Sequence, residues 1–288
     1  MDSVEDALKV RKMVEMTLAD FEVIATAGTG AILYSRRWSS TDLPRNLHAA
    51  AVATVLRLGS LDYAKRRHVP ASEPLTETSA NEHFIAATTF AREYMDTVRD
   101  NISDDEVPLT LGAHASRVAL QRLQSGFRAS DLLYRLGFNY EGDAVARQIL
   151  EQIAWSLVAG EMDDIESIGR IKAQGAVSKL KKIVPSMGEL YGRLSATTHA
   201  GLDQHREAFM SEEGTNPYVL LAWSRLGESA RLLSLLADAW VVVWEKTQHP
   251  FMTSLVAFAS PDDALPIANR EFLLAAQSLI TVIDDSER

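Results

Sequence analysis

The chain has 288 residues, of which 47% are hydrophobic and 24% are charged, and this is the composition of an ordinary folded globular protein. It contains no cysteine, which excludes disulfides, a thiolate nucleophile and cysteine-ligated zinc or iron–sulfur sites. The formal net charge is -10, so the surface as a whole does not attract nucleic acid or anionic lipid, although a local basic patch can still do so.

The ends and the apolar runs of the chain indicate where it resides. The first six residues include three acids, whereas a secretory signal begins with basic residues. The most apolar run, Leu232 to Trp244, is interrupted by Asp238 and is shorter than the roughly 18 to 20 residues that a membrane-spanning helix needs. We therefore expect a cytoplasmic protein that does not enter a membrane.

The spacing of apolar residues predicts the fold class. Spacings of three and four recur through most of the chain, and alternation with period two is rare. The 15 glycines and 9 prolines cluster where helices are expected to end. The sequence therefore predicts an all-α protein with an N-terminal helical hairpin and a C-terminal multi-helix bundle.

Two long helices are predicted in the N-terminal part, from about Val4 to Arg37 and from about Pro44 to Arg67, and they form the hairpin. The stretch Pro70 to Thr78, which is rich in proline and hydroxyl residues, is the best candidate for a linker. Residues 1–75 would thus form the hairpin and residues 76–288 the bundle. We expect the apolar faces of the hairpin to be incompletely covered within one chain, which favours a homodimer.

In the bundle, capping residues, glycines and apolar periodicity predict the remaining helices. These run approximately from Ser79 to Ile102, Gly112 to Leu136, Glu141 to Ala159, Asp163 to Val184, Met187 to Ala200, Asn216 to His249 and Ile267 to Val282.

Strong enzyme motifs are absent from the sequence. It has no glycine-rich phosphate loop, no Gly-x-Ser-x-Gly elbow, no His-Glu-x-x-His pair and no EF-hand loop. Its histidines do not have metal-ligand spacing. We therefore predict no metal and no cofactor.

The segment from Glu189 to His199 carries the most suggestive polar residues. On a helix Tyr191, Ser195 and His199 are successive i, i+4 neighbours on one face, and Arg193 lies on a different azimuth. A histidine in this setting can act as a general acid or base near neutral pH, and an arginine can hold an anionic group. Alternatively, His199 caps the helix C-terminus and Tyr191 packs in the core.

A second pattern is an arginine and a glutamate at i, i+4, Arg147 and Glu151, on a helix that otherwise reads as buried. The pair could reach toward the Tyr191–His199 helix and there tune His199 or hold a ligand. It could equally lock two helices together or lie exposed at the surface.

Arg128 belongs to a polar stripe that runs along the helix predicted from Gly112 to Leu136. Its members are Arg117, Gln121, Gln124, Arg128, Asp131 and Arg135. The stripe is either a solvated face or the wall of a cleft that accepts phosphate or an acidic partner through arginine.

Three stretches resemble, in this order, a bacterial all-helical family of unassigned function whose members pair an Arg-x-x-x-Glu helix with a later Tyr-x-x-Leu-Ser-x-x-x-His helix. The stretches are Arg128 to Gly137, Ala144 to Glu151, and Tyr191-x-x-Leu194-Ser195-x-x-x-His199. The resemblance covers about residues 113–249.

A looser similarity is to the HEPN helical domains, many of which are dimeric ribonucleases of toxin–antitoxin and phage-defence systems. Their signature is an arginine followed by four to six residues and a histidine. Arg193 and His199 have five residues between them, and Leu194 stands where a polar residue often follows the arginine.

The resemblance implies a metal-independent ribonuclease or a nucleotide-binding protein of the defence type. The implied catalytic pair is Arg193 and His199, and the implied binding residues are Arg147, Glu151, Tyr191, Ser195 and Arg128. In a ribonuclease His199 would move the 2′-hydroxyl proton and Arg193 would stabilise the charged phosphorane.

Two other functions stay open. In a non-catalytic module for protein–protein interaction, Arg193 and His199 would be buried and satisfied, whereas a catalytic site needs both in a cleft or dimer groove. A helical sensor that binds a small molecule would have an apolar pocket between the bundle helices.

Overall fold

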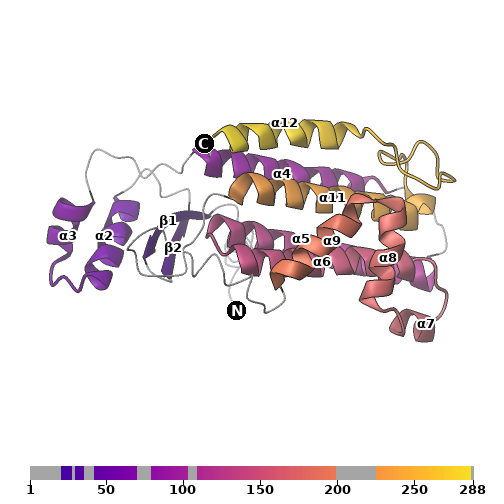
Figure 1. Cartoon of the computed structure of the whole chain (residues 1–288), viewed down its shortest axis with the longest axis horizontal. Helices are drawn as coiled ribbons and strands as arrows, with labels where there is room; N and C mark the ends of the chain where they lie inside the picture. The colour runs from indigo at the N-terminus through magenta and orange to yellow at the C-terminus, as the bar shows by residue number, and fades with distance from the viewer. Residues whose placement is uncertain are drawn as a thin grey trace, which may run out of the picture. The chain divides into compact units, whose positions relative to one another are not determined.

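The computed structural model describes residues 21–27, 30–35, 42–69, 79–102, 109–198 and 225–286. Helices dominate these residues, which confirms the all-α fold class (Figure 1). The chain divides into two compact units, Met1–Glu82 and His83–Arg288. The predicted linker from Pro70 to Thr78 lies outside the described residues. None of the described helices is long and apolar enough to cross a bilayer.

The first unit contains a β-hairpin where the sequence predicts a helix. Strand β1 (Phe21–Ala27) pairs in antiparallel fashion with β2 (Gly30–Ser35), with Phe21 opposite Ser35. Strand β1 is rich in β-branched and aromatic residues, and β2 contains Ile32 and Tyr34; such residues favour a pleated backbone over a helix. The predicted helix from Val4 to Arg37 is therefore wrong over these two strands, and its remaining residues lie outside the described ranges.

The second predicted helix of the hairpin is divided into two. Helix α2 (Leu43–Val55) and helix α3 (Leu61–His68) are separated by a turn in which Arg57 has a φ of 51°. Helix α3 starts afresh because the Ser60 hydroxyl accepts a hydrogen bond from the Tyr63 backbone N–H at 3.2 Å. The apolar spacing extends across this break, so spacing alone does not reveal it.

The second unit is a bundle of helices (Figure 1). Its elements are α4 (Ser79–Asp100, which begins just before the unit boundary), α5 (Leu111–Arg135), α6 (Asn139–Ala159), α7 (Ile165–Gly169), α8 (Ala173–Ile183), α9 (Ser186–Thr198), α11 (Leu226–Gln248), the 3-10 turn η4 (His249–Phe251) and α12 (Glu271–Ser286). Helix α6 packs against α5, α8, α9 and α11, and α11 packs against α5 and α12.

Most of the predicted helix boundaries in the bundle that fall on described residues agree with the structure to within a few residues. The predicted helix end at Ala200 and helix start at Asn216 lie outside the described residues. Gly137, with a φ of 77°, follows α5, as its predicted role as a helix stop requires. The helix predicted from Asp163 to Val184 is instead two helices, α7 and α8. Helix α7 begins where the Asp164 carboxylate accepts a hydrogen bond from the Ser167 backbone N–H at 2.8 Å, and three residues separate the end of α7 from the start of α8.

Helix α11 lies at the centre of the bundle core. Its tryptophans Trp240 and Trp244 are fully buried and stack with ring centroids 4.9 Å apart. The Trp240 indole N–H donates to the Leu120 carbonyl oxygen at 2.9 Å, which ties α11 to α5. Every residue from Leu236 to Glu245 is buried, so this part of α11 is enclosed on all sides, as expected of a helix in the interior of a bundle.

The two buried carboxylates of α11, Asp238 and Glu245, have partners in the segment that follows it. The Arg270 guanidinium forms a two-pronged ion pair with the Asp238 carboxylate, in which Arg270 Nε lies 2.6 Å from Asp238 Oδ1. The side chains of Arg270 and Asp238 are 7% and 2% exposed. The fully buried Glu245 carboxylate accepts hydrogen bonds from the backbone N–H groups of Val256 and Ala257 at 2.7 and 2.9 Å. These contacts fix the segment between η4 and α12 against α11.

The Arg270–Asp238 pair can be tested against an exposed pair of the same helix α11, in which Arg231 contacts Asp284 of α12 at 3.1 Å. Arg270→Ala leaves a buried carboxylate without a partner, so we expect a loss of about 3–5 kcal/mol in the free energy of unfolding. Arg231→Ala should cost less than about 1 kcal/mol because that pair is hydrated. Urea denaturation measures both, and equal losses would contradict the assigned role of Arg270.

Candidate functional site

A polar stripe runs along α6 where this helix packs against α9. Asp143, Arg147 and Glu151 follow one another at spacings of four residues, so they lie on one face of the helix. Helix α9 contributes polar side chains to the same seam. Two groups of polar contacts form here, one around Arg147 and one around Asp143.

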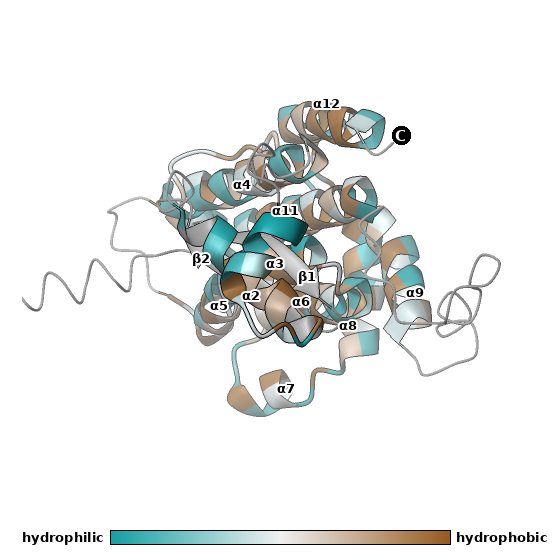
Figure 2. Cartoon of the chain, turned by 90° about the vertical axis from the view of Figure 1, so that its left-hand side faces the viewer, coloured by the Kyte–Doolittle hydropathy of each residue, from teal (hydrophilic) through white to brown (hydrophobic). Residues whose placement is uncertain are grey.

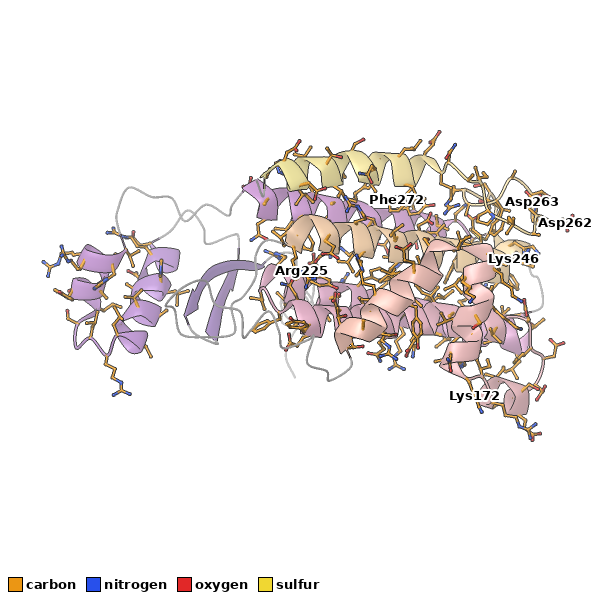
Figure 3. The ribbon with its side chains drawn as sticks, in the orientation of Figure 1. Lys172, Arg225, Lys246, Asp262, Asp263 and Phe272 are labelled. Carbon is orange, nitrogen blue, oxygen red and sulfur yellow. The ribbon has the colours of Figure 1, made fainter. Side chains whose placement is uncertain are left out.

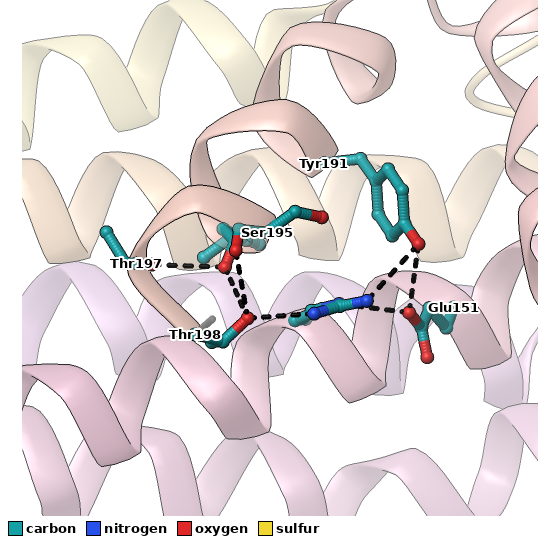
Figure 4. A network of polar contacts seen from close by, with 7 residues as sticks. Glu151, Tyr191, Ser195, Thr197 and Thr198 are labelled. Carbon is teal, nitrogen blue, oxygen red and sulfur yellow. Dashed lines mark hydrogen bonds and ion pairs between the residues drawn. The ribbon is translucent and has the colours of Figure 1, made fainter. Parts of the chain in front are cut away.

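The first group, the Arg147 network, consists of Arg147, Glu151, Tyr191 and Thr198 (Figure 4). Arg147 Nε donates to Glu151 Oε1 at 3.0 Å, Nη1 to the Thr198 hydroxyl at 2.9 Å and Nη2 to the Tyr191 hydroxyl at 3.4 Å. The Tyr191 hydroxyl in turn donates to Glu151 Oε1 at 3.2 Å. Two helices that are distant in sequence are thus joined through one guanidinium.

Packing holds the Arg147 network in addition to its hydrogen bonds. The guanidinium carbon of Arg147 lies 5.4 Å from the centroid of the Tyr191 ring, within the range of a cation–π interaction. The Thr198 hydroxyl is oriented by donating to the Leu194 carbonyl oxygen at 2.8 Å. The side chains of Arg147 and Glu151 are 23% and 27% exposed, so solvent still reaches the network.

Ser195 lies on the same face of α9, between Tyr191 and Thr198. Its hydroxyl oxygen is buried and has no hydrogen-bond partner among the described residues. A buried hydroxyl without a partner costs free energy, so it marks a place in the seam that a partner atom would stabilise.

The second group, the Asp143 cluster, lies at the other end of the stripe. The Tyr134 hydroxyl donates to Asp143 Oδ1 at 2.8 Å. Burial raises the pKa of Asp143, against the opposing effects of the Tyr134 and Thr197 hydroxyls and of the Arg225 and Arg193 charges. Burial and the nearby Asp143 charge hold the pKa of Tyr134 well above its ordinary value. The proton between these two side chains is therefore held tightly.

Gly142 makes the Asp143 cluster sterically feasible. A Cβ atom at this position would lie 2.6 Å from the Tyr134 ring, closer than two carbon atoms can approach. The missing side chain lets the Tyr134 ring lie against α6 and bring its hydroxyl to Asp143.

Arg193 faces this second group and not the first. Its Nη1 lies 2.7 Å from Glu228 Oε1 at the start of α11, and Arg225 Nε approaches the other carboxylate oxygen of Glu228 at 3.5 Å. The side chains of Arg193 and Glu228 are 44% and 41% exposed. Both side chains are therefore accessible to a ligand from solution.

The structure thus brings together three of the residues singled out in the sequence, namely Arg147, Glu151 and Tyr191, with Ser195 on the same helix face. It places Arg193 in a separate group, in agreement with the different azimuth expected from the sequence. Arg128 is partly buried on α5 and joins neither group. His199 follows the last described residue of α9 and lies outside the described ranges.

Other members of these groups were not singled out from the sequence. Asp143 was detectable, because it precedes Arg147 by four residues on α6. Thr198 lies inside the predicted segment but gave no separate signal. Tertiary packing brings in Tyr134, Arg225 and Glu228. The spacing of residues along the sequence does not reveal such contacts between helices.

The predicted polar stripe on α5 is only partly a solvated face. Asp131 and Arg135 are 4% and 0% exposed, so a solvated face is wrong for these two residues. The Thr88 hydroxyl on α4 donates to Asp131 at 2.8 Å, and this partner stabilises the carboxylate inside the bundle.

Compared with protein-family models, curated proteins and solved structures, the chain has no significant match. Among the described residues, no three histidine, aspartate or glutamate side chains are grouped so that they could hold a metal ion.

The Arg147 network has a matched control in Arg170, which pairs with Glu166 at the same i, i+4 spacing but is 76% exposed. Arg147→Ala removes three charge-assisted hydrogen bonds from a partly buried seam, so we expect it to lower the free energy of unfolding by about 2 kcal/mol. Arg170→Ala should cost only about 0.3–0.5 kcal/mol. Denaturant titration measures the free energy of unfolding of both variants. Similar losses in the two would show that the network does not join α6 to α9.

The Asp143 cluster predicts a pH dependence of stability. Because its pKa is raised in the folded state, the contribution of Asp143 to the free energy of unfolding is largest when the carboxyl is protonated. It falls as the pH rises from about 4, the pKa of an unfolded aspartate, through the folded pKa. Asp143→Asn removes this titration, so the stability of the wild type relative to the variant should decline over that window.

Asp164 provides a control of opposite sign. It is exposed, and hydrogen bonds from Ser167 lower its pKa. The stability of the wild type relative to Asp164→Asn should therefore rise with pH. Unfolding curves recorded across the acidic pH range test both variants. If the stability of the wild type relative to Asp143→Asn rose with pH, the raised pKa of Asp143 would be contradicted.

Proposed function

We propose that this chain is a HEPN-like helical protein that acts on RNA or a nucleotide without a metal ion, and that its site lies along the seam between α6 and α9. The proposal places Arg193 and His199 at the reaction centre. Arg147, Glu151, Tyr191 and Ser195 hold the substrate or the helix that carries these two residues. Arg128 is a further contact for the substrate.

The fixed guanidinium of Arg147 is the observation that carries the proposal. An arginine side chain has five N–H donors, and the hydrogen bonds to Glu151, Thr198 and Tyr191 use three of them. The side chain is still 23% exposed. A guanidinium that is held in place and retains two donors suits a phosphate group, because no side-chain ordering is needed when the phosphate binds.

Arg193 of α9 adds a second cation to the seam. Its guanidinium is exposed beside Glu228, and it precedes His199 by six residues. The chain is acidic overall, so an RNA substrate would be held by such local cations and not by the average charge of the surface.

The proposed reaction is transesterification of RNA. His199 takes the proton of a ribose 2′-hydroxyl, and the 2′-oxygen attacks the adjacent phosphorus. The bond from phosphorus to the 5′-oxygen breaks, that oxygen takes a proton from water, and the resulting hydroxide removes the proton from His199. The products are a 2′,3′-cyclic phosphate and a 5′-hydroxyl, with no oxidant or metal consumed. Arg193 stabilises the additional negative charge of the phosphorane.

A non-catalytic interaction module is the second candidate, and the Arg147 network also favours it. The same hydrogen bonds that fix Arg147 satisfy Glu151 and the Tyr191 hydroxyl within the chain. In this case the seam only joins α6 to α9, and the function resides in the binding of a protein partner. A homodimer is compatible with both candidates.

The proposal is tested by cleavage of labelled single-stranded RNA and transfer RNA in the presence of a chelator. We expect the wild type to cleave, and His199→Ala and Arg193→Ala to be at least about 100-fold slower, because a general acid or base contributes 10²–10⁴-fold. Arg231→Ala is the matched control, since it removes an exposed arginine that pairs with Asp284, away from the seam. It should cleave at the wild-type rate.

Circular dichroism and sedimentation on the same samples establish folding and oligomeric state. The absence of cleavage by the folded wild type would overturn the ribonuclease and favour the interaction module. Cleavage that neither variant slows would overturn the assignment of Arg193 and His199.

A further inference from the structure

A separate cavity lies between α4, α12 and the segment that joins η4 to α12. Its volume is about 630 Å³, within the range of about 300–1,000 Å³ that is typical of small-molecule sites. It is lined by Phe90, Tyr94, Val256, Ile267, Asn269, Arg270, Glu271, Phe272 and Ala275. None of these residues belongs to the seam between α6 and α9.

One wall of the cavity is aromatic. Figure 3 shows Phe272 at the start of α12, on the side of the helix that faces α4. Its ring is almost parallel to that of Tyr94, with centroids 4.0 Å apart and an interplanar angle of 5°. The Phe90 ring stacks on Phe272 with centroids 5.3 Å apart. Flat rings arranged in this way favour a flat aromatic guest, which can extend the stack.

The rim of the cavity leaves apolar surface exposed to water. Val256 and Ile267 are 44% and 41% exposed, although both lie in a segment that Glu245 and Arg270 fix against α11. Helix α12 is itself largely hydrophobic (Figure 2). A ligand in the cavity would remove this apolar surface from water.

The cation that lines the cavity, Arg270, is already neutralised by an ion pair. The Arg270 guanidinium donates to both oxygens of Asp238 and to the Ile267 carbonyl oxygen. Glu271 is exposed to solvent at the rim. Since the lining cation is already paired and the solvated carboxylate repels anions, the cavity suits an uncharged molecule and disfavours a negatively charged one.

Tyr94 supplies a polar group for recognition. No described residue forms a hydrogen bond with its hydroxyl, so this donor is available to a ligand. Burial and the Asp238 and Glu245 charges raise the pKa of Tyr94, so the hydroxyl keeps its proton at physiological pH.

We propose that this cavity binds an uncharged, flat aromatic molecule that packs on the Phe272 side of the cavity and accepts a hydrogen bond from the Tyr94 hydroxyl. The site is distinct from the proposed RNA site and does not depend on it.

Prodan, an uncharged naphthalene ketone whose emission shifts to the blue in apolar surroundings, is a suitable probe. Its counterpart with a carboxylate in place of the ketone tests the role of charge. We expect saturable binding of prodan to the full chain, at least about tenfold weaker binding of the naphthoate, and about fivefold weaker binding of prodan to Tyr94→Phe, which loses one hydrogen bond.

Two tryptophan substitutions on α12 distinguish loss of prodan binding caused by filling the cavity from an effect that any added tryptophan would have. Ala275 is exposed and lines the cavity, so Ala275→Trp should fill it and abolish prodan binding. Leu274 is 61% exposed and does not line it, so Leu274→Trp should bind prodan as the wild type does. Circular dichroism checks that both variants are folded.

Several results would overturn the proposal. These are a wild type without saturable prodan binding, an Ala275→Trp variant that binds normally, and a naphthoate that binds as tightly as the ketone. If Tyr94→Phe bound prodan with unchanged affinity, the proposed hydrogen bond from the Tyr94 hydroxyl to the ligand would be ruled out. A wild-type dimer that Ala275→Trp dissociates and that does not bind prodan would show that this face is a contact between two copies of the chain.

Discussion

The enclosure of α11 from Leu236 to Glu245, where every residue is buried, constrains each of its neighbours. This part of the helix cannot solvate a charge, so Asp238 and Glu245 each need a partner inside the protein. Both partners come from the segment after η4, as the Arg270 guanidinium and the backbone N–H groups of Val256 and Ala257. The segment has little regular structure of its own, and its course is set by these two carboxylates. The cavity beside α12 exists because this course is fixed.

The polar seam shows how one helix can arrange two different electrostatic environments. Asp143 and Arg147 are one turn apart on α6 and both are partly buried, yet the first is a carboxyl with a raised pKa and the second is a cation. Helix α9 contacts both, through Thr197 and Thr198 respectively. A shift of α9 along α6 would therefore disturb both groups together. Whatever binds at one end of the seam can influence the other.

The extent to which the sequence predicts this molecule follows from the range of the interactions involved. Long helices such as α5 and α6 are encoded by local periodicity and by stops such as Gly137, so they were predicted closely. The hairpin of β1 and β2 was missed because its strands are short and carry apolar residues at successive positions, a pattern that is also compatible with a helix. The division between α2 and α3 depends on the backbone conformation at Arg57 and on the cap at Ser60.

The candidate site was predictable only within each helix. The i, i+4 spacings placed Arg147 with Glu151, and Tyr191 with Ser195, and they placed Arg193 on another face. The contact of Arg147 with Tyr191 is a property of helix packing, and the sequence left it as one of several alternatives. Buried charges such as Asp131 were missed because their partner, here Thr88, lies on a different helix far along the chain.

Gly142 has an effect that a list of functional groups would overlook. It has no side chain to ionise, donate or accept, yet the space it leaves is what allows the Tyr134 hydroxyl to reach Asp143. Even a methyl group there would push the ring aside and separate the Asp143 carboxylate from its donor. The Tyr134 hydroxyl opposes the effect of burial on the pKa of Asp143, so the volume of the preceding residue influences the proton affinity of this acid. In a mutational scan, position 142 should behave like a member of the polar cluster, although it contributes only an absence of atoms.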